Sequence, residues 1–163
     1  MNFKLPLIAA FVAALSLTAC GGGSGGNAPV AASPAALVKT DTVLGTGTEA
    51  TANSTVSVRY TGWIYDDKIA GFKGRQFDTS GATVVEFSLN GVVAGFAQGI
   101  AGMKVGGKRT ILIPGSLGYG ANGNPSAGIA PGAGLVFDVE LVGVPLAWWL
   151  LGEKFHWRTG TAI

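Results

Sequence analysis

Four segments of the chain alternate between apolar and polar residues with the two-residue period of a β-strand. They are residues 54–64, 84–89, 108–114 and 134–143. The last of them, GLVFDVELVG, is the clearest, because every second residue from Leu135 to Leu141 is large and apolar. Successive side chains of a strand point to opposite faces, so this pattern predicts strands that bury one face.

A helical period replaces the alternation between the second and third of these segments. Val92, Phe96 and Ile100 recur there four residues apart. Gly95 and Gly99 each cost a helix about 1 kcal/mol relative to alanine, so we expect a short helix that depends on packing. Several strands and one short helix predict an α+β domain in which an antiparallel sheet wraps over the helix.

Residues 65–76, YDDKIAGFKGRQ, follow neither period. They carry charge, glycine and an isolated Phe72, and they predict a long loop or bulge between two strands. Asp66 and Asp67 form a pair of acids in this stretch. Because adjacent aspartates near glycine are usually part of a solvated turn, we prefer that interpretation to a general acid and base.

The first 19 residues have the features of a lipoprotein signal peptide. Lys4 supplies a positive charge, and the apolar stretch that follows is short for a membrane-spanning helix. The stretch ends in LTAC, residues 17–20, which resembles the bacterial lipobox and implies diacylglycerol on the Cys20 sulfur with cleavage before it. An ordinary secretory signal with an unmodified cysteine is the alternative. Cys20 is the only cysteine, so an intrachain disulfide is impossible and the fold must depend on its core.

Composition divides the rest of the chain into three parts. Residues 20–40 comprise the lipidated cysteine and a tether rich in Gly, Ser, Ala and Pro, which cannot bury enough apolar surface to fold. Residues 41–143 form the folded domain. Residues 144–163 are an apolar extension with three tryptophans, too short to span a bilayer. The extension could dock on the domain, lie at a membrane interface, or have no selected role.

The charge balance argues against nucleic-acid binding. Without residues 1–19 the chain has ten Lys and Arg residues against nine Asp and Glu. A protein that binds nucleic acid through its charge needs a basic stripe. The nearest candidate, KVGGKR at residues 104–109, is better explained as a turn with solvated flanks. We therefore predict no nucleic-acid partner.

Few residues of the chain can support hydrolytic or metal chemistry. The one histidine, His156, lies in the C-terminal extension, and the one cysteine is the predicted lipid attachment site. A zinc site and a Ser/His/Asp or Cys/His nucleophile both lack their residues. We expect no metal and no other cofactor. What the domain has instead is aromatic and aliphatic residues near glycine turns, a composition that an ordinary core also explains.

Four motifs, taken in order, resemble those of the FKBP-type peptidyl-prolyl isomerases. They are VRYTGWI, GRQFDTS, GFAQGIAGMKVGGKR and YGANGNPSAGIAPGAGLVFDVEL. The resemblance runs from about Leu44 to Val142, and the set is specific although each motif alone is weak. It implies an FKBP-like α+β fold, a twisted antiparallel sheet of five or six strands wrapped around one short helix. It also implies peptidyl-prolyl cis-trans isomerase activity in an apolar pocket.

Carried over position by position, the family's pocket falls on ten residues of this chain. The resemblance implies catalytic roles for Tyr60, Phe77, Asp78, Phe96, Tyr119 and Phe137. It implies substrate contacts for Val85, Val92, Val93 and Ile129. Phe96 stands where the family usually has tryptophan, which implies a deeper pocket and altered activity or ligand affinity. Asp78 is expected at the rim, accepting a hydrogen bond from Tyr60 or a ligand, or else capping a turn.

The chemistry of prolyl isomerisation agrees with a site that has no nucleophile. An X–Pro bond rotates over a barrier of about 18–20 kcal/mol because the twisted form loses amide resonance. Water stabilises the planar, charge-separated amide, and an apolar enclosure removes that stabilisation. The loop at residues 119–132, YGANGNPSAGIAPG, has no acid, base or thiol and is expected to form one wall of this enclosure.

The resemblance to the FKBP family also implies partners, and the resemblance of residues 17–20 to a lipobox implies a location. The expected substrates are proline-containing unfolded or extended polypeptides, and macrolide FKBP ligands are further candidate binders. Gly21 after Cys20 favours the outer membrane of a two-membrane bacterium over the inner one, with the domain facing the periplasm and assisting protein folding there. Two alternatives stay open: an FKBP-fold binding or chaperone module with little or no turnover, and an anchored protein with no pocket.

Overall fold

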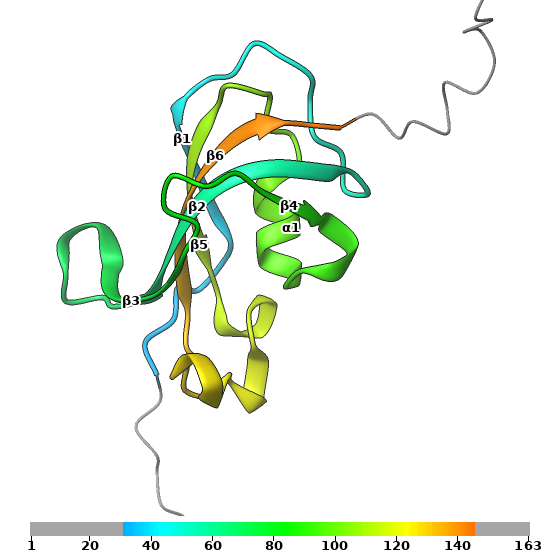
Figure 1. Ribbon diagram of the computed structural model, residues 1–163. Coiled ribbons are helices and arrows are strands. Elements are labelled where there is room, and N and C mark those ends of the chain that lie inside the picture. Colours follow the sequence, from blue (N-terminus) through cyan, green and yellow to red (C-terminus); the bar gives the residue numbers. More distant parts are fainter. Residues whose placement is uncertain (1–30, 146–163) are drawn as a thin grey trace, which may run out of the picture.

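The computed structural model describes residues 31–145, which form one sheet, one α-helix and several short 3-10 turns (Figure 1). The predicted signal peptide, Cys20 with residues 21–30 of the predicted tether, and residues 146–163 of the extension lie outside the described residues. Within residues 31–145, no helix reaches the length and hydropathy that crossing a membrane requires.

The sheet has six strands, and every pairing in it is antiparallel. The strands are β1 (Val38–Val43), β2 (Thr55–Tyr65), β3 (Lys73–Thr79), β4 (Val85–Ser88), β5 (Lys108–Ile113) and β6 (Leu135–Gly143). Their hydrogen-bonded order is β1-β5-β6-β2-β3, and β4 also pairs with β2. The long strand β2 therefore has β4 and β3 one after the other along one edge. With one helix, α1 (Ala94–Ile100), the predicted α+β fold is confirmed.

Helix α1 covers one face of the sheet and packs closely against β5 (Figure 1). A Cβ atom at Gly99 would lie 2.6 Å from side-chain atoms of Ile111, and one at Gly95 would overlap Ile113. These glycines weaken the helix as a local structure, but they allow its backbone to approach the strand. The core lies between α1 and the sheet, and its largest fully buried side chains include Val56, Val58, Ile100, Ile111, Ile113, Leu135, Val139 and Leu141.

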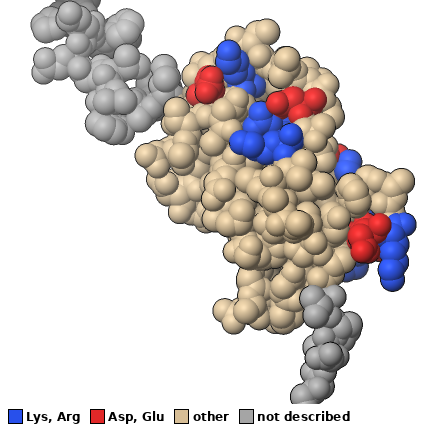
Figure 2. Space-filling view, turned by 180° about the vertical axis from the view of Figure 1, so that it is seen from behind, with Lys and Arg blue, Asp and Glu red and all other residues tan. Residues whose placement is uncertain are grey.

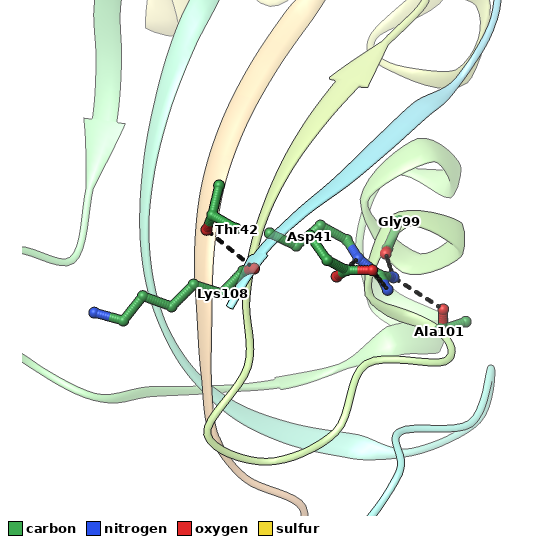
Figure 3. Close-up of polar contacts among 6 residues, drawn as sticks. Asp41, Thr42, Gly99, Ala101 and Lys108 are labelled. Atoms are coloured by element: carbon green, nitrogen blue, oxygen red, sulfur yellow. Dashed lines mark hydrogen bonds and ion pairs between the residues drawn. The ribbon is translucent and has the colours of Figure 1, made fainter. Parts of the chain in front are cut away.

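A nearly buried arginine joins the edge strand β1, strand β5 and the end of α1 (Figure 3). Arg109, on β5, is 8% exposed. Its Nε and Nη2 donate to the two carboxylate oxygens of Asp41 at 2.7 and 3.0 Å. Its Nη1 donates to the carbonyl oxygen of Gly99 at 2.7 Å and to that of Ala101 at 3.4 Å. The carbonyl groups at the end of a helix need such donors, so Arg109 both pairs with a carboxylate and caps α1.

Two features differ from the sequence-based predictions, and both are exposed edge strands. Residues 38–43 form β1, so the prediction of a tether through residue 40 is wrong at its C-terminal end. Residues 73–76 belong to β3, so the predicted loop is limited to residues 66–72. All six residues of β1 are exposed, and β3 buries none of its residues fully. A strand without a buried face has no apolar alternation, which is why both strands were missed.

Candidate active site

A cavity of about 300 Å³ opens on the helix-covered face of the sheet. Its walls come from β2, β3, β4, β6, the segment that leads into α1, α1 itself, and the long connection between β5 and β6. The residues that line it are Tyr60, Phe77, Asp78, Phe87, Gly91, Val92, Val93, Phe96, Tyr119 and Phe137. Segments far apart in the sequence therefore meet around one apolar space.

Aromatic rings packed edge to face form most of the cavity wall. The centroids of Phe96 and Phe137 are 4.9 Å apart with the ring planes at 66°, and those of Phe77 and Phe137 are 5.6 Å apart at 87°. The ring centroid of Phe87 lies 5.6 Å from that of Tyr60 and 6.1 Å from that of Phe96. Such pairs are favoured because the positive edge of one ring meets the negative face of the other. Phe96 and Phe137 are only 4% and 6% exposed and form the floor.

A glycine behind the rings makes this packing possible. A Cβ atom at Gly62, in the middle of β2, would lie 2.8 Å from ring atoms of both Phe77 and Phe137. Real Cβ atoms essentially never come so close to another heavy atom. Any larger residue at position 62 would push the two rings into the cavity, so the YTG motif has a steric function here.

The polar groups at the rim of the cavity are paired with each other. The Tyr60 hydroxyl donates to Oδ2 of Asp78 at 2.7 Å, while Oδ1 of Asp78 accepts the backbone N–H of Thr79 at 2.8 Å. Burial, followed by the hydrogen bond to Asp78, raises the pKa of Tyr60 well above its usual value. The tyrosine is therefore protonated throughout the physiological range and holds the carboxylate as a donor. Asp78 therefore accepts the hydrogen bond expected from Tyr60 and, at the same time, the backbone N–H of the residue that follows it.

The backbone N–H of Val93 is a further polar group at the cavity. Val93 comes directly before α1, and its carbonyl oxygen accepts the N–H groups of Phe96 and Ala97 at 3.0 and 3.2 Å. Among the residues described, its own N–H donates no hydrogen bond. A donor beside an apolar space is suited to a carbonyl oxygen of a bound peptide.

A second, larger depression of about 360 Å³, here called the polar depression, lies on the other side of the sheet and is lined mainly by charged and hydroxyl-bearing residues. Both of its carboxylates are paired with cations: Lys73 Nζ lies 2.6 Å from Asp138 Oδ2, and Arg59 and Lys108 lie 3.5 and 3.7 Å from the carboxylate oxygens of Glu140. Figure 2 likewise shows Lys and Arg beside Asp and Glu rather than in a basic stripe. Within residues 31–145, no three His, Cys, Asp or Glu side chains come together as a metal site. The aromatic cavity is the better candidate.

Comparison with known proteins assigns the sequence of this domain to a family. The family profile described as FKBP-type peptidyl-prolyl cis-trans isomerase matches residues 46–142. The chain belongs to this family. An FK506-binding protein of Streptomyces anulatus is 42% identical over 115 residues, which cover 68% of this chain and 88% of that protein. The activity of the chain is accordingly that of a peptidyl-prolyl cis-trans isomerase.

Solved structures of FKBP-type proteins show the same fold. A peptidyl-prolyl cis-trans isomerase from Pseudomonas syringae pv. tomato is 34% identical with a TM-score of 0.59, over 68% of this chain and 76% of that one. FkpA from Escherichia coli is 37% identical with a TM-score of 0.59, over 68% of this chain and 49% of that one.

Most of the FKBP pocket residues expected from the sequence surround the cavity. Those that line it are Tyr60, Phe77, Asp78, Val92, Val93, Phe96, Tyr119 and Phe137. Val85 and Ile129 do not line it. Val85 pairs with Val58 in the sheet, and Ile129 is 2% exposed and packs into the core beneath the loop. The expectation that these two residues contact substrate has no support from their positions.

Two cavity residues were not among those expected. Phe87 lies two residues after Val85 on β4 and reaches the rings of Tyr60 and Phe96. Its aromatic character and its place in an alternating strand were a usable signal. Gly91 ends the turn before α1, and no atom lies within 4 Å of the position of a Cβ there. Nothing in the sequence distinguishes Gly91 from other turn glycines.

Proposed function

We propose that the aromatic cavity accelerates rotation of X–Pro bonds by excluding water, without a nucleophile or a proton transfer. The observation that carries this proposal is the composition of the cavity wall. Its one carboxylate, Asp78, is held by Tyr60, and the other side chains that line it are aromatic or aliphatic apart from the Tyr119 hydroxyl. Such a wall offers hydrogen bonds and an apolar surface, but no thiol, imidazole or amine side chain.

Each part of the cavity has a distinct task in this mechanism. The rings of Phe77, Phe96 and Phe137 would seat the proline ring, since Phe137 packs edge to face against each of the other two. The Val93 N–H and the Tyr119 hydroxyl would hold substrate carbonyl groups on either side of the bond. Removing water from the planar amide raises its free energy more than that of the twisted form, which has less charge separation. The barrier of about 18–20 kcal/mol is thereby lowered.

Removing one ring of the cage tests this mechanism. Phe77 is only half-buried, so Phe77→Ala should leave a folded domain but reduce kcat/KM for a peptide with an apolar residue before proline by about 100-fold or more, the equivalent of about 3 kcal/mol. The matched control is Phe72→Ala, because Phe72 is an exposed phenylalanine that stacks on Tyr65 away from the cavity. Equal rates for Phe77→Ala and the parent protein would refute the assignment of the site.

The isomerisation assay, combined with a measurement of FK506 binding, separates turnover from binding alone. Relatives that carry the name FK506-binding protein make FK506 a suitable ligand for the cavity. Phe96 fills the floor, where the family usually has tryptophan. A protein that binds FK506 but isomerises the peptide no faster than buffer would be a binding or chaperone module, whereas a protein that binds no FK506 and shows no turnover would have no functional pocket.

We further propose that the isomerase is a lipoprotein tethered to a membrane outside the cytoplasm, where it assists the folding of proline-containing polypeptides. The support is the sequence LTAC at residues 17–20 after an apolar stretch, followed by the Gly- and Ser-rich segment. Gly21 favours the outer membrane of a two-membrane bacterium. The chain should incorporate radioactive palmitate and should be recovered in the membrane fraction of the cell. Cys20→Ala should abolish both the labelling and the membrane association. A labelled Cys20→Ala chain, or an unlabelled parent chain, would contradict this proposal.

A further inference from the structure

The connection between β5 and β6 forms one wall of the cavity, yet its own fold is irregular. It consists of three 3-10 turns of three residues each, Gly115–Leu117, Gly120–Asn122 and Pro125–Ala127. It presents Tyr119 to the cavity and inserts Ile129 into the core. Its hydrogen bonds are mostly internal, such as the reciprocal pair between Asn124 and Ile129 at 2.8 and 2.9 Å. A segment of this kind is ordered only as far as the surrounding structure holds it.

The tip of this wall loop is held by an arginine from β3. Nη2 of Arg75 donates to the carbonyl oxygens of Ala127 and Gly128, at 3.1 and 2.6 Å. Among the residues described, no other hydrogen bond joins residues 119–133 to a different segment. Because Arg75 lies two residues before Phe77 in β3, it ties the strand that forms one side of the cavity to the loop that forms another.

The base of the wall loop is held by residues 32–34, which lie within the predicted tether of residues 20–40. The Gly115 N–H donates to Oγ of Ser33 at 2.9 Å, and the Gly134 N–H donates to the carbonyl oxygen of Ala32 at 2.9 Å. A Cβ atom at Gly134 would lie 2.5 Å from Cδ of Pro34, so only glycine leaves room for this segment. In Figure 1 the described chain accordingly begins at the end of the sheet where the loop between β5 and β6 lies. Residues 32–34 therefore belong to the isomerase domain.

We propose that Arg75 and Ser33 are positioning residues that order the wall loop and so set the affinity of the cavity for its ligands. Neither residue lines the cavity, so their effect must pass through the loop that carries Tyr119. If the loop were free to move, binding would have to restrict it, and the entropy lost would weaken affinity. The two contacts remove this cost in advance. The proposal rests on the assignment of the cavity as the binding site.

The test uses the full chain with Arg75→Met, which keeps much of the side-chain length but removes the donors, and with Ser33→Ala. We expect each variant to raise KM for an X–Pro peptide and Kd for FK506 by on the order of threefold to tenfold, and the double variant to raise them further. The value of kcat should change less than twofold, because the aromatic cage is untouched. Amide hydrogen exchange at Gly128 and Ile129 should become faster in Arg75→Met.

Two further variants distinguish positioning from a general loss of stability. Lys68→Met removes another exposed cation from the connection between β2 and β3 and should leave KM, Kd and loop exchange unchanged. Ser33→Thr keeps a hydroxyl group and should restore the parental affinity. Unchanged Kd and unchanged loop exchange in the folded double variant would overturn the proposal, as would equal losses in Lys68→Met. If the parent chain showed no isomerase activity, the proposed mechanism would be refuted. The measurement of amide exchange in the loop needs neither ligand nor turnover, so it would still test the role of Arg75 and Ser33.

Discussion

On β6, Phe137 lines the aromatic cavity and Val139 packs in the core, whereas the side chains of Asp138 and Glu140 form ion pairs in the polar depression on the opposite side of the sheet. The helix-covered face packs aromatic and aliphatic side chains so closely that glycine is required at several positions. The opposite face carries ion pairs whose members stay about one-third to one-half exposed. The comparison shows that one strand supplies both a water-excluding site and a solvated surface. Substitutions on the helix-covered face should therefore change the free energy of unfolding strongly, through loss of burial, and substitutions on the opposite face should change it little.

The largest effect is expected from removing a ring on the helix-covered face. Phe137→Ala should lower the free energy of unfolding by about 3–5 kcal/mol, because it leaves a cavity where the rings of Tyr60, Phe77 and Phe96 now pack against Phe137. Urea denaturation at neutral pH measures this loss. A loss below about 1 kcal/mol would mean that the rings around position 137 collapse into the space and are not packed as described.

A smaller but more informative effect is expected from Gly99→Ala. Helix propensity alone predicts that alanine stabilises α1 by about 1 kcal/mol. The structure predicts the opposite, since the new Cβ would lie 2.6 Å from Ile111 and force the helix away from β5, at a cost of about 1–3 kcal/mol. Gly102→Ala is not a suitable control, because Gly102 has a φ of +82°. Gly91→Ala is suitable, since its Cβ position is open and its φ is not positive. A stabilised Gly99→Ala would contradict the packing of α1.

The ion pair between Asp41 and Arg109 should make stability depend on pH in the acid range. The hydrogen bond from Arg109 holds the pKa of Asp41 below its usual value of 3.8. A carboxyl with a lowered folded-state pKa contributes stability above its unfolded-state pKa, and this contribution is lost as pH falls through the folded-state pKa. Asp41→Asn should therefore be less stable than the parent by about 1 kcal/mol at pH 7, and the difference should shrink below about pH 4. Chemical denaturation from pH 7 to pH 2.5 measures it, and a difference independent of pH would contradict this role of the charge.

The smallest effect is expected on the solvated face. Lys73→Met removes the ion pair with Asp138 and the contact of the ammonium group with the Trp63 ring, 4.8 Å from its centroid. Because both members of the pair are partly exposed, and Asp138 keeps a hydrogen bond from Thr110 at 2.7 Å, we expect a loss of at most about 1 kcal/mol. Thermal unfolding at low and high salt measures it. A loss as large as that of Phe137→Ala would erase the contrast between the two faces.

The parts of the fold that were predictable are those that bury one face. Strands β2, β4, β5 and β6 showed the two-residue period, and α1 showed a helical one. Strands β1 and β3 showed neither, because they lie at edges and expose most of their residues. Burial is what imposes a pattern on a sequence, so an exposed edge strand can have almost any composition.

The candidate site was predictable to the extent that its residues sit in recognisable motifs. Tyr60, Phe77 and Phe137 occur in such motifs and line the cavity. Ile129 occurs in one too, but the structure buries it in the core. Arg75 and Ser33 show no pattern in sequence, because their role depends on carbonyl and N–H groups that the fold brings to them from 52 and 82 residues away.

The order of apolar and polar residues was enough to determine the class of fold and the buried faces of β2, β4, β5 and β6. Composition alone showed that residues 41–143 contain no histidine or cysteine that could act as a nucleophile. Only the tertiary structure decided how close α1 could come to β5, which aromatic rings meet around one cavity, and what holds the wall loop in place. The physical reason is range. Periodicity reflects which face of an element is buried, a local property, whereas a cavity arises from contacts between segments whose separation along the chain carries no information about their distance in space.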